Sequence, residues 1–374
     1  MGRSSFLQYD PQDHNPQYLE DIATGYWFSE VLFTAVEMDI FSMLEPDGRT
    51  LEQLAGCLEL DESGLKRFLG ALCALGLVCQ NQGTYYNGQL ARQFLVKGKE
   101  DYQGDSILWR KKIFENWRSL SSCLQKGTRV KYAPEEDDPA ELAKRFRRYS
   151  SAMDCVARSK AKEMLPFFNN VSLSGDILDI GSGLGGISMA FLDTFPETNA
   201  TLMDLDQVLD YAKEQYGNKY QGRINYASAN ILEHWPVEEG KFDLVILSNI
   251  VHAYAEKEIF LILKRAAACL KTGGFLLIHD FFFEHYPEKA ALFDLNMFVN
   301  TFNGKVFSVS WVREKLHETG LAASEMVPLE SDTALVFGSK SEDCLKALCL
   351  DKKEQLAARI QRLGFHGAYL IPTE

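Results

Sequence analysis

The second half of the chain alternates short apolar runs rich in β-branched residues with amphipathic helical segments, beginning after Val171. Strands that alternate with helices form parallel, doubly wound sheets, because each helix carries the chain back across one face of the sheet. The alternation therefore predicts an α/β domain with a Rossmann-like sheet. Five runs are expected as its parallel strands: Asp176–Ile180, Ala200–Asp204, Ile224–Ala229, Phe242–Ser248 and Gly274–Asp280. Two later runs, Ala322–Leu329 and Thr333–Gly338, are expected to pair as a hairpin at one edge.

The first hundred residues have a helical pattern instead. From Gln17 to Leu44 apolar residues recur at helical spacing on more than one face, which predicts a helix buried on two sides, as in an intertwined dimer. Thr50 and Gln53 form the signature of a capping box that opens a second helix. Asp61 is expected to cap a third. The run Val78–Asn87, centred on a glycine, predicts a hairpin, so the whole unit resembles a helical winged-helix domain.

A winged helix can bind DNA or serve as a dimerisation scaffold, and charge favours the second. The chain has a formal net charge of −13, and its expected hairpin carries no basic residue. Lys66 and Arg67 on the presumed recognition helix are offset by Asp61 and Glu62. DNA binding draws most of its energy from contacts between basic side chains and phosphates. We therefore expect no nucleic-acid partner and a unit that forms a homodimer.

The sequence composition also indicates the cellular compartment in which the protein is expected to work. The eight cysteines include no Cys-x-x-Cys pair, which favours reduced thiols and no structural zinc. No apolar run reaches the ~18–20 residues that span a bilayer. The first residues lack the apolar stretch of a signal peptide. The expectation is a cytoplasmic enzyme without a metal or a membrane partner.

The strongest local signal is the segment 179–186, Asp-Ile-Gly-Ser-Gly-Leu-Gly-Gly, between the first expected strand and a helix. Glycines suit such a loop because the chain turns sharply while its backbone approaches a bound nucleotide. Gly181, Gly183 and Gly186 satisfy the Gly-x-Gly-x-x-Gly pattern of dinucleotide sites. An NAD site is therefore the alternative to a site for S-adenosylmethionine.

Two acidic residues bear on that choice. Asp179 ends the strand directly before the glycines, where a carboxylate suits a cationic ligand and repels a pyrophosphate. Asp204 ends the next strand, where it can accept hydrogen bonds from both ribose hydroxyls in either kind of site. The position of Asp179, and the location of the loop behind a complete helical unit, favour S-adenosylmethionine.

Taken with the residues that follow, these motifs resemble the two-domain class I S-adenosylmethionine-dependent O-methyltransferases of the caffeate and hydroxyindole type. The resemblance covers roughly residues 17–340. It implies a winged-helix dimerisation domain at 17–100, helical linker and substrate-lid segments at 101–170, a seven-stranded catalytic domain at 171–340 and a helical extension at 341–374. It also implies the cofactor-binding residues Asp179, Gly181, Gly183, Gly185, Asp204, Leu205, Asn230, Ile231 and Ser248. Asn230 stands where the family usually has an aspartate beside the adenine.

The resemblance also assigns a catalytic pair. His252, in Ser-Asn-Ile-Val-His-Ala-Tyr, matches the general base of the family, and Asp280 matches a carboxylate that orients it. A second orienting carboxylate of the family is missing, because residues 304–308 read Gly-Lys-Val-Phe-Ser. This absence suggests an acceptor that is already acidic, such as a phenol or an enol. The alternative for His252 is a histidine that only forms a hydrogen bond at the end of a strand.

Residues that face the acceptor are implied in the same way. The segment 294–300 closely resembles its hydroxyindole-type counterpart, which places Asn296, Met297 and Asn300 against the substrate. Met153 matches a methionine that packs on the acceptor ring. The function expected is methyl transfer to the hydroxyl oxygen of a small, aromatic molecule. Transfer to carbon, nitrogen or sulfur, or a protein that binds the cofactor without catalysis, are the alternatives.

Overall fold

A computed structural model describes residues 16–130, 138–171 and 173–348 of the chain. The chain divides into two compact units, one up to Phe114 and one from Glu115 onwards. Helix α7 (Gly104–Trp117) contains the division between them. Among the residues described, no helix is long and apolar enough to cross a bilayer.

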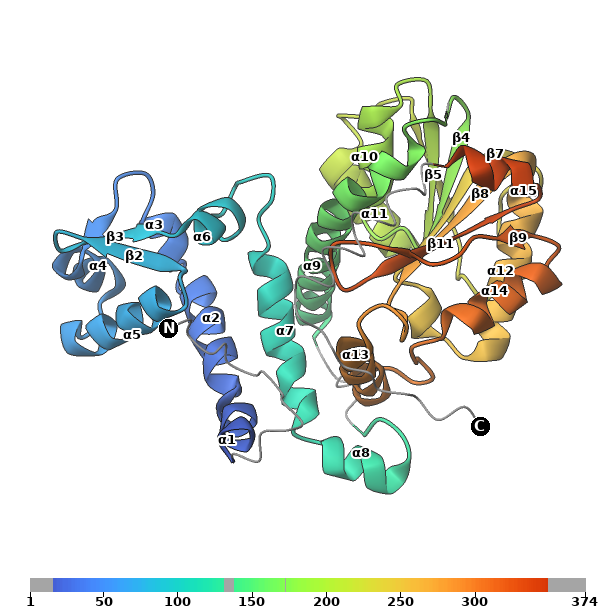
Figure 1. The fold of residues 1–374 in the computed structure, drawn as a ribbon. Helices are drawn as coiled ribbons and strands as arrows, with labels where there is room; N and C mark the ends of the chain where they lie inside the picture. The colour runs from blue at the N-terminus through green and yellow to red at the C-terminus, as the bar shows by residue number, and fades with distance from the viewer. Residues whose placement is uncertain (1–15, 131–137, 172, 349–374) are drawn as a thin grey trace. The chain divides into compact units, whose positions relative to one another are not determined.

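The N-terminal unit is a helical bundle with a small sheet, as the sequence predicts (Figure 1). Its sheet has the order β1-β3-β2, with antiparallel neighbours. The capping box of Thr50 and Gln53 is present, and the Asp61 side chain accepts from the Gly64 backbone N–H at 2.7 Å. The elements are α1 (Gln17–Thr24), α2 (Tyr26–Glu37), α3 (Ile40–Met43), β1 (Arg49–Thr50), α4 (Leu51–Leu58), α5 (Glu62–Ala74), β2 (Val78–Asn81), β3 (Thr84–Asn87) and α6 (Gln89–Phe94).

The single helix expected over Gln17–Leu44 is wrong. The segment forms three helices, separated at Gly25 and at Asp39, whose φ of 58° lies in the left-handed region. A left-handed residue cannot continue a right-handed helix, so the chain changes direction there. Buried residues are found in α2 and α3, whereas α1 has none.

The C-terminal unit is a mixed sheet covered by helices on both faces. Its helices are α8 (Leu120–Lys126), α9 (Pro139–Met164), the 3₁₀ turn η1 (Leu165–Phe168), α10 (Gly186–Thr194), α11 (Asp206–Tyr216), η2 (Val251–Ala253), α12 (Glu256–Cys269), α13 (Pro287–Asn300), α14 (Val309–Glu318) and α15 (Glu342–Ala347). Its strands are β4 (Asp176–Ile180), β5 (Asn199–Asp204), β6 (Ile224–Ser228), β7 (Phe242–Ser248), β8 (Leu270–Asp280), β9 (Ala322–Ala323), β10 (Val327–Pro328) and β11 (Ala334–Ser339). The sequence predicts one helix over residues 342–363 of the extension, but α15 ends at Ala347, because Leu348 has an extended backbone. Residues 349–374 lie outside the described residues.

The strand order is β10-β11-β8-β7-β4-β5-β6, with β9 also paired to β11. Strands β4 to β8 are parallel, and β11 runs antiparallel between β8 and β10. This is the predicted Rossmann-like sheet with a hairpin at one edge. The run 322–329 differs from expectation, because it is interrupted and supplies two short strands, β9 and β10.

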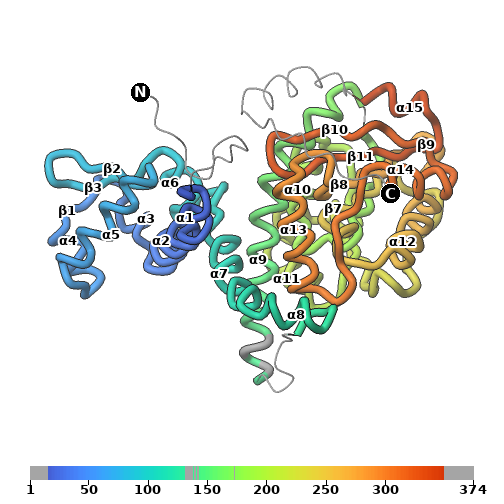
Figure 2. The backbone as a smooth tube through the Cα atoms, turned by 60° about the horizontal axis from the view of Figure 1, so that its bottom comes forward, coloured from blue at the N-terminus to red at the C-terminus, as the bar shows by residue number. Residues whose placement is uncertain are grey.

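Helices cover both faces of this sheet (Figures 1 and 2), and an apolar layer on each face packs the helices against it. Successive residues of β4 point to opposite faces, so Ile177 packs with α9, α10 and α11 while Leu178 packs with α12 and α14. Phe168 is fully buried in the first layer, with ring centroids 5.1 Å from Phe191 and 5.8 Å from Phe337. Apolar burial on both faces explains why these strands are almost continuously hydrophobic.

The parallel register brings four strand ends to one edge of the sheet. Ile180 pairs with Met203 on one side and with Leu247 on the other, and Ser248 pairs with His279. The carboxyl ends of β4, β5, β7 and β8 therefore lie in a row. In open α/β sheets this edge is where ligands bind.

Candidate active site

The loop after β4 is shaped by three glycines with left-handed backbones. Gly181, Gly183 and Gly185 have φ values of 64°, 57° and 91°. A side chain at Gly185 would also place its Cβ 2.8 Å from the Leu202 side chain. Glycine adopts such angles at no steric cost because it lacks a Cβ, so three left-handed positions in one loop favour these residues. The structure confirms a tight turn between β4 and α10.

Asp204, at the end of β5, ties this loop to the next strand. Its carboxylate accepts the Gly183 N–H at 2.9 Å and the Leu205 N–H at 2.8 Å. Burial raises the pKa of Asp204, although these two hydrogen bonds oppose the rise. Leu205 is 47% exposed beside it.

Asp179 lies near the end of β4, and its carboxylate reaches the first turn of α10. It is buried and accepts hydrogen bonds from the hydroxyl of Ser188, at 2.7 Å, and from the Ser188 backbone N–H. Burial raises the pKa of Asp179 to about 6, and the nearby charge of Asp204 adds to the rise. A pyrophosphate binds in dinucleotide sites at such a helix terminus. Here an internal carboxylate already takes that place, so the loop suits a cationic ligand rather than NAD.

Helix α9 supports the same loop through a residue that the sequence did not single out. Asp154 is buried and accepts the Tyr216 hydroxyl at 2.6 Å, and Arg158 pairs with it at 3.1 Å. A Cβ built on Gly186 would lie 2.6 Å from the Asp154 carboxylate, which shows how closely α9 approaches the loop. Met153, the predicted acceptor contact, is half-buried beside Asp154. Tertiary packing alone brings this part of α9 to the glycine loop.

The predicted catalytic pair is assembled at the end of β8. His252 lies in η2, and its Nδ1 is 2.6 Å from Asp280 Oδ1. The buried carboxylate also accepts the backbone N–H groups of His252, at 3.2 Å, and of Phe281, at 2.8 Å. The three contacts orient Asp280 as an acceptor, so Nδ1 of His252 carries the proton. Nε2 is left as the nitrogen that can accept one.

Two aromatic rings enclose the imidazole. Phe293, on α13, meets the His252 ring edge-to-face with 5.0 Å between centroids. Phe281 stacks on Phe293 at 3.7 Å, and its centroid is 6.1 Å from that of His252. The sequence predicts Phe281, with Phe282 and Phe283, as part core and part pocket floor, whereas Phe293 was not predicted as a site residue. Spacing on α13 offered a signal for Phe293, since it lies three residues before Asn296 and so shares a face of the helix.

The predicted acceptor residues of α13 form a polar network. Asn296 Oδ1 accepts from Trp117 Nε1 and from Asn300 Nδ2, both at 3.0 Å. Asn300 Oδ1 accepts from Asn116 at 2.7 Å, and its backbone carbonyl accepts from Arg129 at 2.7 Å. Met297 is buried on the same helix. The end of α7 and the segment after α8 are thereby fastened to α13.

The remaining predicted residues differ in accessibility. Ser248, at the end of β7, is half-buried, with its hydroxyl 2.8 Å from His279 Nδ1. Ile231 is buried, and its carbonyl accepts from Trp235. Asn230 is exposed after β6, where it bonds to the Leu232 N–H at 3.1 Å. Asp179, Asp204, Ser248 and Asp280 thus share one edge, and the residues after β6 flank it.

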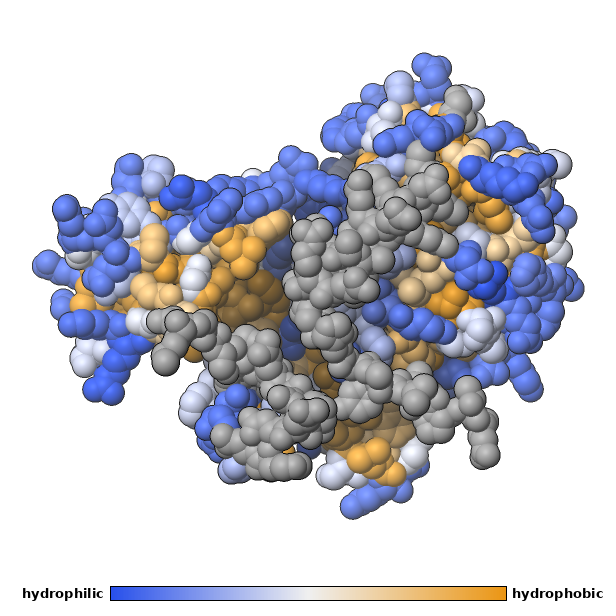
Figure 3. Space-filling view, in the orientation of Figure 1, coloured by the Kyte–Doolittle hydropathy of each residue, from blue (hydrophilic) through white to orange (hydrophobic). Residues whose placement is uncertain are grey.

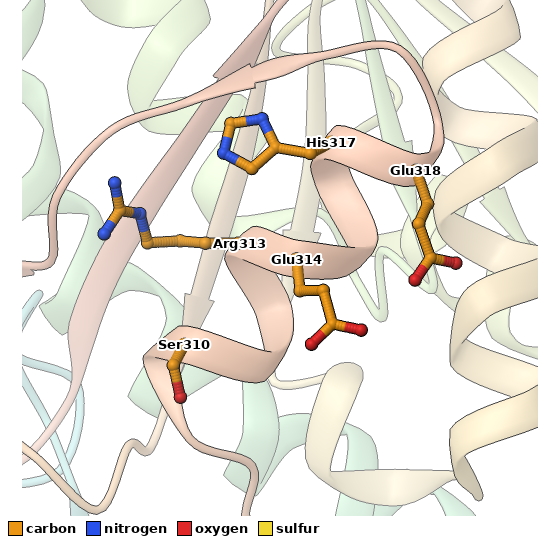
Figure 4. A pocket seen from close by; sticks show the side chains of 5 residues that line it. All are labelled: Ser310, Arg313, Glu314, His317 and Glu318. Atoms are coloured by element: carbon orange, nitrogen blue, oxygen red, sulfur yellow. The ribbon is translucent and has the colours of Figure 1, made fainter.

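Other surface features lie away from this edge. A shallow hollow on α14 is lined by polar residues that point outwards, and none belongs to the predicted site (Figure 4). Its residues are Ser310, Arg313, Glu314, His317 and Glu318. In the described part of the chain, no three His, Cys, Asp or Glu residues are grouped so as to hold a metal ion.

The fold and the site define a Rossmann-like methyltransferase unit joined to a winged-helix unit. The chain matches the O-methyltransferase domain over residues 132–322 and the O-methyltransferase dimerisation domain over residues 20–97. It therefore belongs to the O-methyltransferase family and is an S-adenosylmethionine-dependent enzyme. The arrangement of Asp179 and Asp204 fits that cofactor, because a cationic ligand would offset two carboxylates whose charge is disfavoured by burial.

Two curated relatives and one solved structure illustrate the similarity. The 3-hydroxy-5-methyl-1-naphthoate 3-O-methyltransferase of Streptomyces sahachiroi is 27% identical over 91% of this chain and all of its own length. The N,N-dimethyltransferase OxyT of Streptomyces rimosus is 26% identical over 70% of this chain and 77% of its own. The crystal structure of human N-acetylserotonin methyltransferase in complex with SAM superposes with a TM-score of 0.77 at 21% identity, covering 89% of this chain and all of that one.

Affinity for the cofactor should depend on pH through Asp179. Its pKa of about 6 in the free protein means that the carboxyl becomes neutral as the pH falls below 6, and a neutral carboxyl attracts a cation weakly. We expect the affinity for S-adenosylhomocysteine, measured by calorimetry, to fall between pH 7 and pH 5, by up to about tenfold per pH unit below the pKa. Asp179→Asn should lose most of this dependence and bind weakly at every pH.

Asp176→Asn is the matched control, because Asp176 lies at the opposite end of the same strand. It should keep both the affinity and the pH dependence of the wild type. Unchanged binding by Asp179→Asn would contradict the role given to that carboxylate.

Proposed function

We propose that this enzyme transfers the methyl group of S-adenosylmethionine to the hydroxyl oxygen of a small aromatic acceptor, with His252 as the general base. The observation that carries the proposal is the 2.6 Å contact between His252 Nδ1 and the buried Asp280, at the same sheet edge as the glycine loop. The naphthoate 3-O-methyltransferase named above supports an aromatic hydroxyl as the acceptor group.

The chemistry required of the protein is alignment and removal of one proton. The sulfonium of the cofactor supplies an activated methyl group. His252 Nε2 accepts the hydroxyl proton, and Asp280 stabilises the imidazolium that forms through its bond to Nδ1. General-base assistance of this kind contributes about 10²–10⁴ in rate, and alignment of the reacting groups contributes ~7–11 kcal/mol.

Aromatic and thioether side chains favour a flat acceptor. The Phe281–Phe293 pair forms an apolar wall beside the imidazole, and aromatic rings stack favourably on such surfaces. Met153 and Met297 are proposed as further contacts with the acceptor ring, since thioether sulfur packs well against aromatic rings. Asn296 and Asn300 are proposed to face the acceptor from α13, held in place by the network with α7.

The acceptor is proposed to be an acidic phenol or enol. Residues 304–308 supply no carboxylate to His252, and Lys305 of this segment pairs with Glu256 instead. Gly304 lies against the backbone of His252, where a Cβ would be 2.5 Å from the carbonyl oxygen. With Asp280 as the carboxylate that polarises His252, a more acidic hydroxyl lowers the demand on the base.

The cofactor contacts are proposed to follow the strand ends in order. Asp204 is proposed to bind the ribose and Asp179 the positive charge of the methionine moiety, with the backbone of Gly181, Gly183 and Gly185 along the ligand. The exposed Leu205 side chain supports an adenine position there, because a bound base would cover it. Asn230 and Ile231 are proposed to complete the adenine slot.

The N-terminal unit is proposed to form a homodimer, with residues 17–100 as the dimerisation domain and 101–170 as the lid that leads to the catalytic domain. Large apolar side chains are exposed along α1 and α2, and Figure 3 shows apolar surface on this unit. The match to the dimerisation domain family supports a second copy as the partner that covers them. The residues exposed are Leu19 at 68%, Ile22 at 52%, Tyr26 at 53%, Trp27 at 57% and Phe28 at 37%.

Loss of the base should slow methyl transfer without weakening cofactor binding. Turnover of a panel of phenols and hydroxynaphthoates, followed with deuterium-labelled S-adenosylmethionine and mass spectrometry, identifies an acceptor. With that acceptor, His252→Ala should lower kcat/KM by about tenfold or more. Asp280→Asn should also lower it, because an amide does not stabilise the imidazolium. S-adenosylhomocysteine affinity should stay near that of the wild type.

His317→Ala, at an exposed position on α14, is the control and should behave like the wild type. A normal rate in His252→Ala would reduce His252 to a residue that only positions the acceptor. Fragmentation of the product locates the new methyl group. A methyl found on nitrogen would replace the O-methyl proposal with the reaction type of OxyT.

The homodimer is tested by light scattering after size exclusion. We expect the wild type at about twice the chain mass of 42.3 kDa. The double variant Leu19→Glu, Trp27→Glu should shift towards the monomer, since it places charge in the exposed apolar face of α1 and α2. Leu90→Glu, on α6 and 58% exposed, should leave the dimer intact. A monomeric wild type would refute the proposal.

A further inference from the structure

His279 is a buried histidine that the proposed reaction does not use. It lies in β8 directly before Asp280 and is 0% exposed. Its Nδ1 is 2.8 Å from the Ser248 hydroxyl, and its Nε2 is 2.8 Å from the Thr333 hydroxyl. Burial lowers the pKa of His279 to about 3, so the ring is neutral at working pH. A neutral imidazole has one N–H donor and one acceptor nitrogen, and both are used here.

Ser248 lies in the middle of the sheet edge formed by the C-terminal ends of β4, β5, β7 and β8. Its neighbour Leu247 pairs with Ile180, the residue before the glycine loop, and Ser248 itself pairs with His279 on β8. The serine therefore lies between the loop of the cofactor and the strand that ends in Asp280. Ser248 is half-buried, whereas His279 and Thr333 are buried behind it. A chain of hydrogen bonds thus leads from the interior of the sheet to the site.

We propose that His279 is a positioning residue that fixes the Ser248 hydroxyl, so that the serine oxygen turns its lone pairs towards the sulfonium end of the cofactor. In this arrangement Nε2–H donates to Thr333, and Nδ1 accepts the Ser248 proton. The proton of Ser248 is then directed away from the ligand. The inference rests on the cofactor and is independent of the acceptor and of the role of His252.

The direction of the Ser248 hydroxyl depends on a neutral His279 ring. A protonated imidazole would donate from both nitrogens, which would turn the Ser248 proton towards a cationic ligand and add a second positive charge. Asp280 Oδ1 and Oδ2 are already occupied by His252 and Phe281, so the adjacent carboxylate has its own donors. A serine without His279 could rotate its hydroxyl and would lose this direction.

Two ligands test whether the Ser248 oxygen interacts with the positive charge of the ligand or only maintains the structure. In sinefungin, a carbon that bears a protonated amine replaces the sulfonium, so the positive charge is kept. S-adenosylhomocysteine has a neutral thioether at the same place. A hydrogen bond to a charged group contributes about 1.5–3 kcal/mol, or about tenfold or more in affinity. By calorimetry, His279→Leu and Ser248→Ala should each weaken sinefungin about tenfold, with a clearly smaller effect on S-adenosylhomocysteine.

His279→Asn is the conservative variant, because its amide oxygen takes the place of Nδ1 and accepts from Ser248. It should recover most of the sinefungin affinity. In the double variant His279→Leu, Ser248→Ala, the loss should match that of Ser248→Ala alone, since His279 acts through the serine. Equal losses for both ligands, or additive losses in the double variant, would overturn the proposal.

A spectroscopic measurement on the unaltered protein does not depend on any variant folding. In ¹⁵N-histidine-labelled enzyme, assigned by comparison with His279→Asn, the His279 resonances should show a protonated Nε2 and an unprotonated Nδ1. This pattern should persist when sinefungin binds. A protonated Nδ1 in the complex would refute the proposed direction of the Ser248 hydroxyl.

Discussion

One constraint governs the site: three carboxylates and a histidine lie close together where the parallel strands of the sheet end. Asp204 and Asp280 are the last residues of their strands and Asp179 is the last but one of β4, and each accepts hydrogen bonds from donors within the protein. Burial raises the pKa of Asp179 and Asp204, so their charge is costly until a cation arrives. The free protein is therefore prepared for a positively charged cofactor, and the same edge holds the His252–Asp280 pair.

Much of this could be predicted because it is local in sequence. The capping residues Thr50 and Asp61, the glycine loop and the ends of β4 and β7 follow from short patterns that the structure confirms. The continuous helix over 17–44 could not be corrected from periodicity, since its breaks, at Gly25 and at the left-handed Asp39, do not interrupt the helical spacing of the apolar residues. The spacing of apolar residues predicts which face of a helix is buried, but it does not predict where the helix ends.

In the site, too, residues within short sequence motifs could be predicted, whereas residues placed by long-range contacts could not. Family motifs supplied His252 and Asp280, and the structure brings them within hydrogen-bond distance. Asp154 and Phe293 escaped prediction, because Asp154 contributes through a partner 62 residues away and Phe293 through a ring contact with His252. No short pattern marks such residues. Their effect is to hold in place the groups that motifs reveal.

The most direct test of the account is the dependence of methyl transfer on the acidity of the acceptor. For phenols of similar shape and graded pKa, log kcat/KM is measured for the wild type and for His252→Ala. If His252 is the base, the variant loses about 10² or more on weakly acidic phenols and much less on those already ionised near pH 7. Equal losses across the series would contradict base catalysis by the His252–Asp280 pair.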